Sequence, residues 1–128
     1  MKATLLVLAA SLACLSGPVR ASDDAVYLIA QIQITDQTGY FETYGAKVGP
    51  LLQKAGAQIL VATPARQTLE GEWPGNWSVV IKFASEADAL NWYNSDAYRA
   101  IRPARLRSTS ANNLILAPAF VQPSQSPQ

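Results

Sequence analysis

The sequence contains no histidine, and its single cysteine, Cys14, lies near the N-terminus. Histidine is the commonest general base and zinc ligand, and it is the usual proximal haem ligand. One cysteine excludes an intramolecular disulfide and a cysteine zinc site. The other residues do not assemble into a metal-ligand set, a nucleophilic triad or a phosphate-binding loop. We therefore expect no metal and no organic cofactor.

The first 21 residues have the features of a secretory signal peptide. Lys2 gives a positive start, residues 3–15 are almost all apolar, and Gly17 and Pro18 precede a small-residue cleavage site after Ala21. The apolar run is shorter than the roughly 20 residues that a membrane-spanning helix needs. The sequence thus predicts an exported chain, periplasmic or secreted, with no membrane association after cleavage.

Lipid attachment at Cys14 is an alternative to simple cleavage. It is disfavoured because Ser11 and Leu12 fit poorly to the Leu-small-small-Cys pattern that precedes a lipidated cysteine. Either route removes the only thiol from the soluble domain or blocks it, which suits an oxidising compartment.

The exported chain is close to neutral. Of ten basic residues, cleavage removes Lys2 and Arg20, which leaves eight against nine acidic ones. This balance gives no electrostatic reason to expect a nucleic acid or an anionic membrane as partner. Residues 22–121 suffice for one domain, and residues 122–128 contain nothing apolar, so we expect a disordered tail there.

Apolar periodicity predicts the order strand, helix, strand, strand, helix, strand. Strands are expected at residues 25–35, 58–63 (with a possible resumption at 66–69), 77–83 and 113–117, and helices at 38–55, from Ser85 onward and, as a short turn, at 97–102. Gly49 and Pro50 predict a kink or restart in the first helix, Gly56 predicts its end, and Pro103 is expected to stop the last helical turn.

This order is that of a ferredoxin-like α+β domain, a four-stranded antiparallel sheet with two helices on one face. Along the first strand Val26 and its alternate neighbours are wholly apolar and should face the helices, whereas the face with Tyr27 and Ile29 is mixed. Nothing in the chain covers this second face. We therefore predict a homodimer with the sheets of two copies packed together.

Three segments together resemble a known family. They are Leu69-Glu70-Gly71-Glu72-Trp73-Pro74, the run Val79–Ser85, and Trp92-Tyr93-Asn94-Ser95-Asp96-Ala97-Tyr98 with Arg105 close behind. The series, within residues 25–117, is similar to domain of unknown function 1330, of the dimeric α/β-barrel superfamily. The resemblance implies a ferredoxin-like protomer and a dimer with facing sheets. It implies little chemistry, because better-known members of the superfamily include cofactor-free monooxygenases, haem-handling enzymes and lactone isomerases.

The sequence departs from the family pattern at the end of the last strand. This strand ends at Pro118, Ala119 and Phe120, where the family often has an acidic residue and glycine.

The best candidate site is aromatic and basic. Tyr98, Arg102 and Arg105 cluster between the second helix and the last strand, with Trp92 and Tyr93 just before them. An arginine can hold a carboxylate or enolate in two parallel hydrogen bonds, and aromatic rings can enclose an apolar ligand. Alternatively, the arginines are solvated and the aromatic pair is core.

Two other groups carry weaker signals. Glu70 and Glu72 act as an acid–base pair only if burial separates their pKa values, and their spacing directs them to opposite faces. Trp73 and Trp77 are expected to anchor the turn against the dimer seam rather than to stack on a ligand.

Three classes of function fit these observations. The first is an exported dimer that binds a small aromatic or oxo-acid compound, the second a cofactor-free enzyme of monooxygenase or isomerase type, and the third a structural or interaction dimer. Binding ranks above catalysis because no residue pair forms a convincing acid–base couple.

Overall fold

A computed structural model describes residues 24–64 and 67–123. The elements are β1 (Val26–Ile34), α1 (Gln37–Gly39), the π-helix η1 (Tyr40–Gly45), α2 (Ala46–Lys54), β2 (Gln58–Thr63), β3 (Trp77–Phe83), α3 (Glu86–Asn94), α4 (Asp96–Arg107) and β4 (Thr109–Pro118). The predicted ferredoxin-like βαββαβ arrangement is confirmed. The predicted signal peptide and the last five residues lie outside the described ranges.

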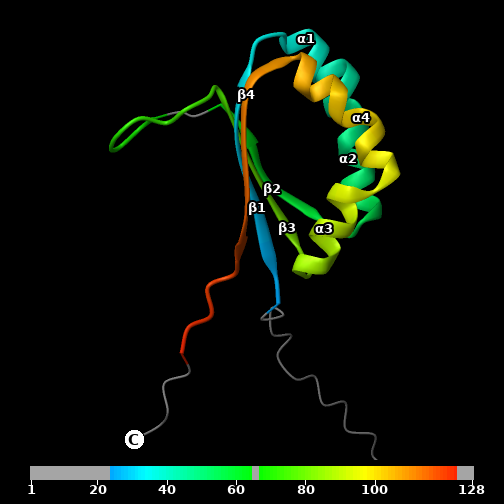
Figure 1. Cartoon of the computed structure of the whole chain (residues 1–128). Coiled ribbons are helices and arrows are strands. Elements are labelled where there is room, and N and C mark those ends of the chain that lie inside the picture. Colours follow the sequence, from blue (N-terminus) through cyan, green and yellow to red (C-terminus); the bar gives the residue numbers. More distant parts are fainter. Residues whose placement is uncertain (1–23, 65–66, 124–128) are drawn as a thin grey trace, which may run out of the picture.

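The four strands form one antiparallel sheet in the order β2-β3-β1-β4. All helices lie against one face of this sheet, and the opposite face is free of helices (Figure 1). Within the described residues, no helix is long and apolar enough to cross a membrane.

The central strand β1 shows why the helices cover that face. Its residues alternate strictly between buried and half-buried, and the buried set is the wholly apolar one that begins at Val26. Side chains on a strand alternate between the two faces, so burying one apolar face fixes the register. The helices bring Tyr44, Leu52, Trp92 and Tyr98 against it.

The predicted interruption at Gly49 and Pro50 is displaced. Pro50 lies inside α2, which continues to Lys54, and the irregular turn is the preceding π-helix η1. A proline inside a helix removes the bond to the carbonyl four residues earlier and crowds it. For Pro50 this carbonyl belongs to Ala46, the first residue of α2 after η1. The helix therefore restarts one turn before Pro50, at the residue whose carbonyl Pro50 leaves without its helical hydrogen bond.

The prediction that Pro103 stops the last helical turn is wrong. α4 runs from Asp96 to Arg107, and Ser95 ends α3 and caps α4 with its side-chain oxygen. An interior proline costs about 3 kcal/mol, but the helix beyond it brings Ala104 and Arg105 into the interior. β4 is correspondingly longer than predicted.

The connection between β2 and β3 extends beyond the sheet (Figure 1). Residues 67–69 are not a strand, contrary to the predicted resumption, and the described residues 67–76 form what we call the arm. Asn76 anchors its base. The Asn76 side chain accepts from the Ile34 backbone N–H at 2.8 Å and donates to the Ile34 carbonyl at 2.9 Å, and its own N–H donates to the Ile32 carbonyl.

Gly75 is required at this anchor. Its φ is +98°, and an added Cβ would lie 2.7 Å from the Ile32 carbonyl oxygen, whereas Gly71, with φ +67°, has open space around it. We expect Gly71→Ala to lower the free energy of unfolding by about 1 kcal/mol and Gly75→Ala by roughly 3 kcal/mol or more, because only the latter adds a backbone clash. Urea unfolding measures both. If the two variants lost the same free energy of unfolding, the close approach of Gly75 to the Ile32 carbonyl would be contradicted.

Candidate functional site

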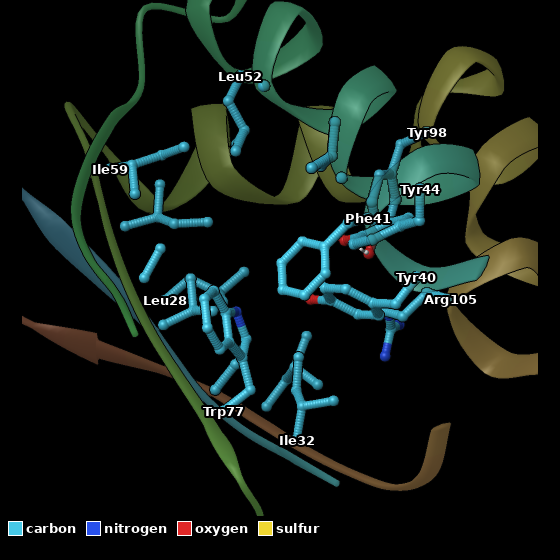
Figure 2. Close-up of a pocket in the computed structure, with 18 of the residues that line it drawn as sticks. Leu28, Ile32, Tyr40, Phe41, Tyr44, Leu52, Ile59, Trp77, Tyr98 and Arg105 are labelled. Carbon is cyan, nitrogen blue, oxygen red and sulfur yellow. Dashed lines mark hydrogen bonds between the residues drawn. The ribbon is translucent and has the colours of Figure 1, made fainter. Parts of the chain in front are cut away.

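A cavity of about 230 Å³ lies between the helical layer and the sheet. Its floor is the buried face of β1 and β3, with Leu114 of β4, and its roof is one face of η1 and α2. In Figure 2 Phe41 and Tyr40 point into this space from the helices, and Trp77 and Ile32 point into it from the sheet. An apolar cavity of about 150 Å³ suffices to bind benzene, so this one suits a single-ring compound with a short substituent.

Aromatic side chains form the wall toward α4. Tyr98, with no exposed surface, packs its ring 4.2 Å from that of Trp92 and 5.3 Å from that of Tyr93. Its hydroxyl lies 3.3 Å from the hydroxyl of Tyr44, and either of the two donates. The Tyr44 ring is in turn 5.3 Å from that of Tyr40.

Nearer the mouth, Phe41 meets Trp77 edge to face at 5.1 Å. Phe41 is 41% exposed and belongs to η1, whereas Trp77 begins β3. The two rings therefore join the roof to the floor on the exposed side of the cavity.

Among the described residues that line the cavity, Arg105 is the only charged one. It is 2% exposed and lies in the last turn of α4. Its Nη1 donates to the Asn112 side-chain oxygen, and its guanidinium lies 5.9 Å from the centre of the Tyr44 ring. Within the described residues, its Nε finds no hydrogen-bond partner.

A closed loop of hydrogen bonds fixes the orientation of this arginine. The Asn112 amide nitrogen donates to the Thr109 hydroxyl at 2.7 Å, and that hydroxyl donates to the Arg105 carbonyl at 2.9 Å. Because the amide nitrogen is used in this way, the amide oxygen faces the guanidinium.

Burial raises the pKa of two tyrosines of the cavity, Tyr40 and Tyr44. Removal from water raises the pKa of Tyr40 to about 12, although nearby Arg105 opposes the change. Burial raises the pKa of Tyr44 further, and the adjacent Tyr98 hydroxyl adds to the shift. At neutral pH both phenols are therefore hydrogen-bond donors and acceptors, not bases.

The lining of the cavity is mostly apolar, with a few polar groups. Among the described residues, its lining is aliphatic and aromatic apart from tyrosine hydroxyls, two indole N–H groups and one guanidinium, and it includes no carboxylate. Such a surface can enclose an apolar body and donate hydrogen bonds to acceptor atoms, but it offers no group to remove a proton at neutral pH. In the described part of the chain, no three His, Cys, Asp or Glu side chains come together as a metal site.

A family model for a domain of unknown function, DUF1330, matches residues 25–119. The chain belongs to the DUF1330 family. A search of curated proteins finds no significant match.

Solved structures similar to this DUF1330 protein share its fold at low identity. A protein of unknown function from Rhodopseudomonas palustris is 15% identical with a TM-score of 0.65, covering 78% of this chain and 85% of its own. A dimeric ferredoxin-like protein of unknown function from a Jannaschia species is 10% identical with a TM-score of 0.62, covering 74% and 99%. SnoaB, a cofactor-independent oxygenase from Streptomyces nogalater, is 16% identical with a TM-score of 0.55, covering 80% and 99%.

Of the five site residues predicted from the DUF1330 sequence, three line the cavity. Trp92, Tyr98 and Arg105 lie together, as described above. Arg102 does not line it; its guanidinium lies 5.6 Å from the centre of the Tyr93 ring, on the side of α4 toward α3. Tyr93 lines a second hollow between α3 and β4 instead.

Sequence reasoning missed part of the cavity wall. The missed residues include Tyr40, Phe41 and Tyr44, which all belong to η1 and line the cavity. The expectation that Trp77 anchors the turn against the dimer seam is wrong, because Trp77 lines the cavity. Its alternation with Val79 on one face of β3 was the signal that could have placed it on the helix-covered face.

The two glutamates of the arm do not form a catalytic pair with the cavity. Glu70 and Glu72 are exposed and line neither hollow. Trp73 of the arm donates its indole N–H to the Ser78 hydroxyl at 3.0 Å, which ties the arm to β3.

The raised tyrosine pKa values predict alkaline destabilisation. In the unfolded chain tyrosines ionise near pH 10, but folded Tyr40 stays protonated to about 12 and Tyr44 does so too. The folded state then holds more protons, so stability falls as pH rises above about 10, by about 1.4 kcal/mol per pH unit for each of the two. Absorbance of tyrosinate measures the titration. Tyr44→Phe should remove one of the groups that ionise well above pH 10. If the tyrosinate absorbance gained in that pH range did not change, the assignment of a raised pKa to Tyr44 would be contradicted.

Proposed function

We propose that this DUF1330 protein is an exported, homodimeric small-molecule-binding protein. Its ligand is a small aromatic or oxo-acid compound held in the cavity between the helices and the sheet. The observation that carries the proposal is the lining of that cavity, which is apolar and aromatic with Arg105 as its one charged group.

The same lining favours binding over catalysis. A cofactor-free enzyme needs a base for its substrate, yet the cavity has no carboxylate and burial keeps Tyr40 and Tyr44 protonated. The similarity to SnoaB, a cofactor-independent oxygenase, keeps such an enzyme as the second candidate. That reaction would require a substrate that ionises without help from a side chain of the cavity.

The uncovered sheet face supports the dimer. The strand register places Val61, Val80, Ile29 and Ile115 side by side across β2, β3, β1 and β4. Ile115 is 59% and Val61 38% exposed in the protomer. Covering a side chain of this size is worth roughly 1.5–3 kcal/mol, and the similar Jannaschia protein is described as dimeric.

Export rests on the N-terminal sequence. A positive start, an apolar run of about a dozen residues and small residues around Ala21 are the features of a cleaved signal. The compartment we propose is the periplasm or the exterior of the cell.

Filling the cavity should abolish binding without unfolding the protein. Gly49 lines the cavity on α2, and an added Cβ would meet no atom within 4 Å. Gly49→Leu therefore occupies the binding space. The gain of about 0.8 kcal/mol from replacing a helical glycine offsets part of the crowding between the new Cβ and the Pro50 ring. Ala46→Leu, on an exposed position of the same helix, is the matched control.

Thermal unfolding with indole, phenylacetate and phenylpyruvate as probes tests this. A probe at a hundred times its Kd stabilises by about 2.7 kcal/mol, which raises Tm by roughly 10 °C in a domain of this size. The shift should appear for the wild type and Ala46→Leu and be absent for Gly49→Leu. Binding that survives in Gly49→Leu would place the ligand elsewhere.

A charge on the uncovered face should dissociate the dimer. Ile115→Lys puts an ammonium at the centre of the proposed seam, whereas Leu106→Lys places the same charge on α4, at a similar exposure of 51%. Native mass spectrometry of the exported chain should give a dimer for wild type and Leu106→Lys and a monomer for Ile115→Lys. A monomeric wild type would refute the proposed dimer interface on the uncovered sheet face.

A further inference from the structure

Arg105 carries a charge for which the described residues provide no acid. Its surroundings are the Asn112 amide oxygen and the face of Tyr44, and its Nε, deep in the interior, has no acceptor. A guanidinium cannot escape this cost by losing its proton. Buried charges in proteins are therefore found paired with an opposite charge.

The other polar groups of the cavity also supply donors in excess. Trp92 Nε1 is buried without an acceptor among the described residues. Tyr44 and Tyr98 have two hydroxyl protons between them and use one in their mutual bond, which leaves the second for an acceptor other than these two hydroxyls. A carboxylate is the complementary group, because it brings only acceptors.

The charge of the complementary ligand is limited to one. The neighbouring basic residues of α4 do not line the cavity, since Arg102 lies over Tyr93 and Arg99 and Arg107 are exposed. A dicarboxylate or a phosphate ester would leave a second negative charge among apolar side chains, which is strongly unfavourable.

The position of the arginine orients the ligand. Figure 2 shows Arg105 beside Tyr40 and Tyr44, at the side of the cavity away from Ile59, with Phe41 and Trp77 between. A carboxylate at the guanidinium therefore leaves the remainder of the molecule among the aromatic rings and the aliphatic floor.

We propose that the cavity binds an aromatic monocarboxylate as its anion, with the carboxylate at the Arg105 guanidinium and the ring toward Phe41 and Trp77. This inference rests on the proposed function and narrows its ligand class to singly charged acids. Asn112 acts as a positioning residue, because its side-chain oxygen accepts from Nη1 and so fixes the orientation of the guanidinium.

The test compares phenylacetate with its neutral isostere phenylacetamide by titration calorimetry at pH 7. We expect phenylacetate to bind at least tenfold more tightly, and its dianionic analogue phenylmalonate to bind more weakly than phenylacetate. Below about pH 4, where the carboxyl group of phenylacetate gains its proton, the preference over the amide should disappear.

Variants assign the preference to Arg105. Arg105→Met should reduce phenylacetate affinity tenfold or more and leave phenylacetamide affinity within threefold, whereas Arg102→Met, on the same helix outside the cavity, should change neither. Circular dichroism checks that the variants fold, and the comparison of acid with amide in the wild type does not depend on them.

The outcomes separate the two proposals. Equal binding of acid and amide by the wild type, or full phenylacetate affinity in a folded Arg105→Met, would overturn the anion site and leave a neutral-ligand cavity standing. Failure of phenylacetate, phenylacetamide and indole alike to bind would overturn the proposed function together with this inference.

Discussion

The packing of Tyr98 holds the helical layer in place. This fully buried ring contacts Trp92 and Tyr93 of α3, and its hydroxyl meets that of Tyr44 in η1. Three helical segments are thus joined through one side chain. Because aromatic rings are wide and rigid, the cluster keeps this end of the layer at a fixed distance from the sheet, and the cavity beside it is bounded by side chains that cannot easily collapse inward.

Most of the fold was predictable because it follows from the periodicity of apolar residues. The alternation along β1 identified the helix-covered face, and Gly56, whose φ is +71°, ended the first helix as expected. Two of the errors concern prolines. Whether Pro50 or Pro103 ends a helix depends on what the following residues bury, and this tertiary gain is not visible in local propensity.

The site was only partly predictable for a similar reason. Arg105 and Tyr98 were found because they stand in a segment typical of the family. Arg102 is three residues from Arg105, about 60° around the helix, and that angle directs it to Tyr93 instead of the cavity. The alternation along β3 could place Trp77 on the helix-covered face, but neither Trp77 nor Tyr40 could be assigned to a cavity, because a cavity reflects the spacing between two layers and no single element's pattern records that spacing.

Stability alone does not explain a buried arginine at this position. Replacing buried ionic groups by apolar residues of similar size is often neutral or stabilising by about 1–4 kcal/mol, and the aliphatic residues around the cavity would accept such a change. Instead, Asn112 and Thr109 form a closed hydrogen-bond loop that orients the guanidinium. A group that is costly to bury and is nevertheless held in a fixed orientation is typical of recognition, where the cost is offset only when the complementary charge binds.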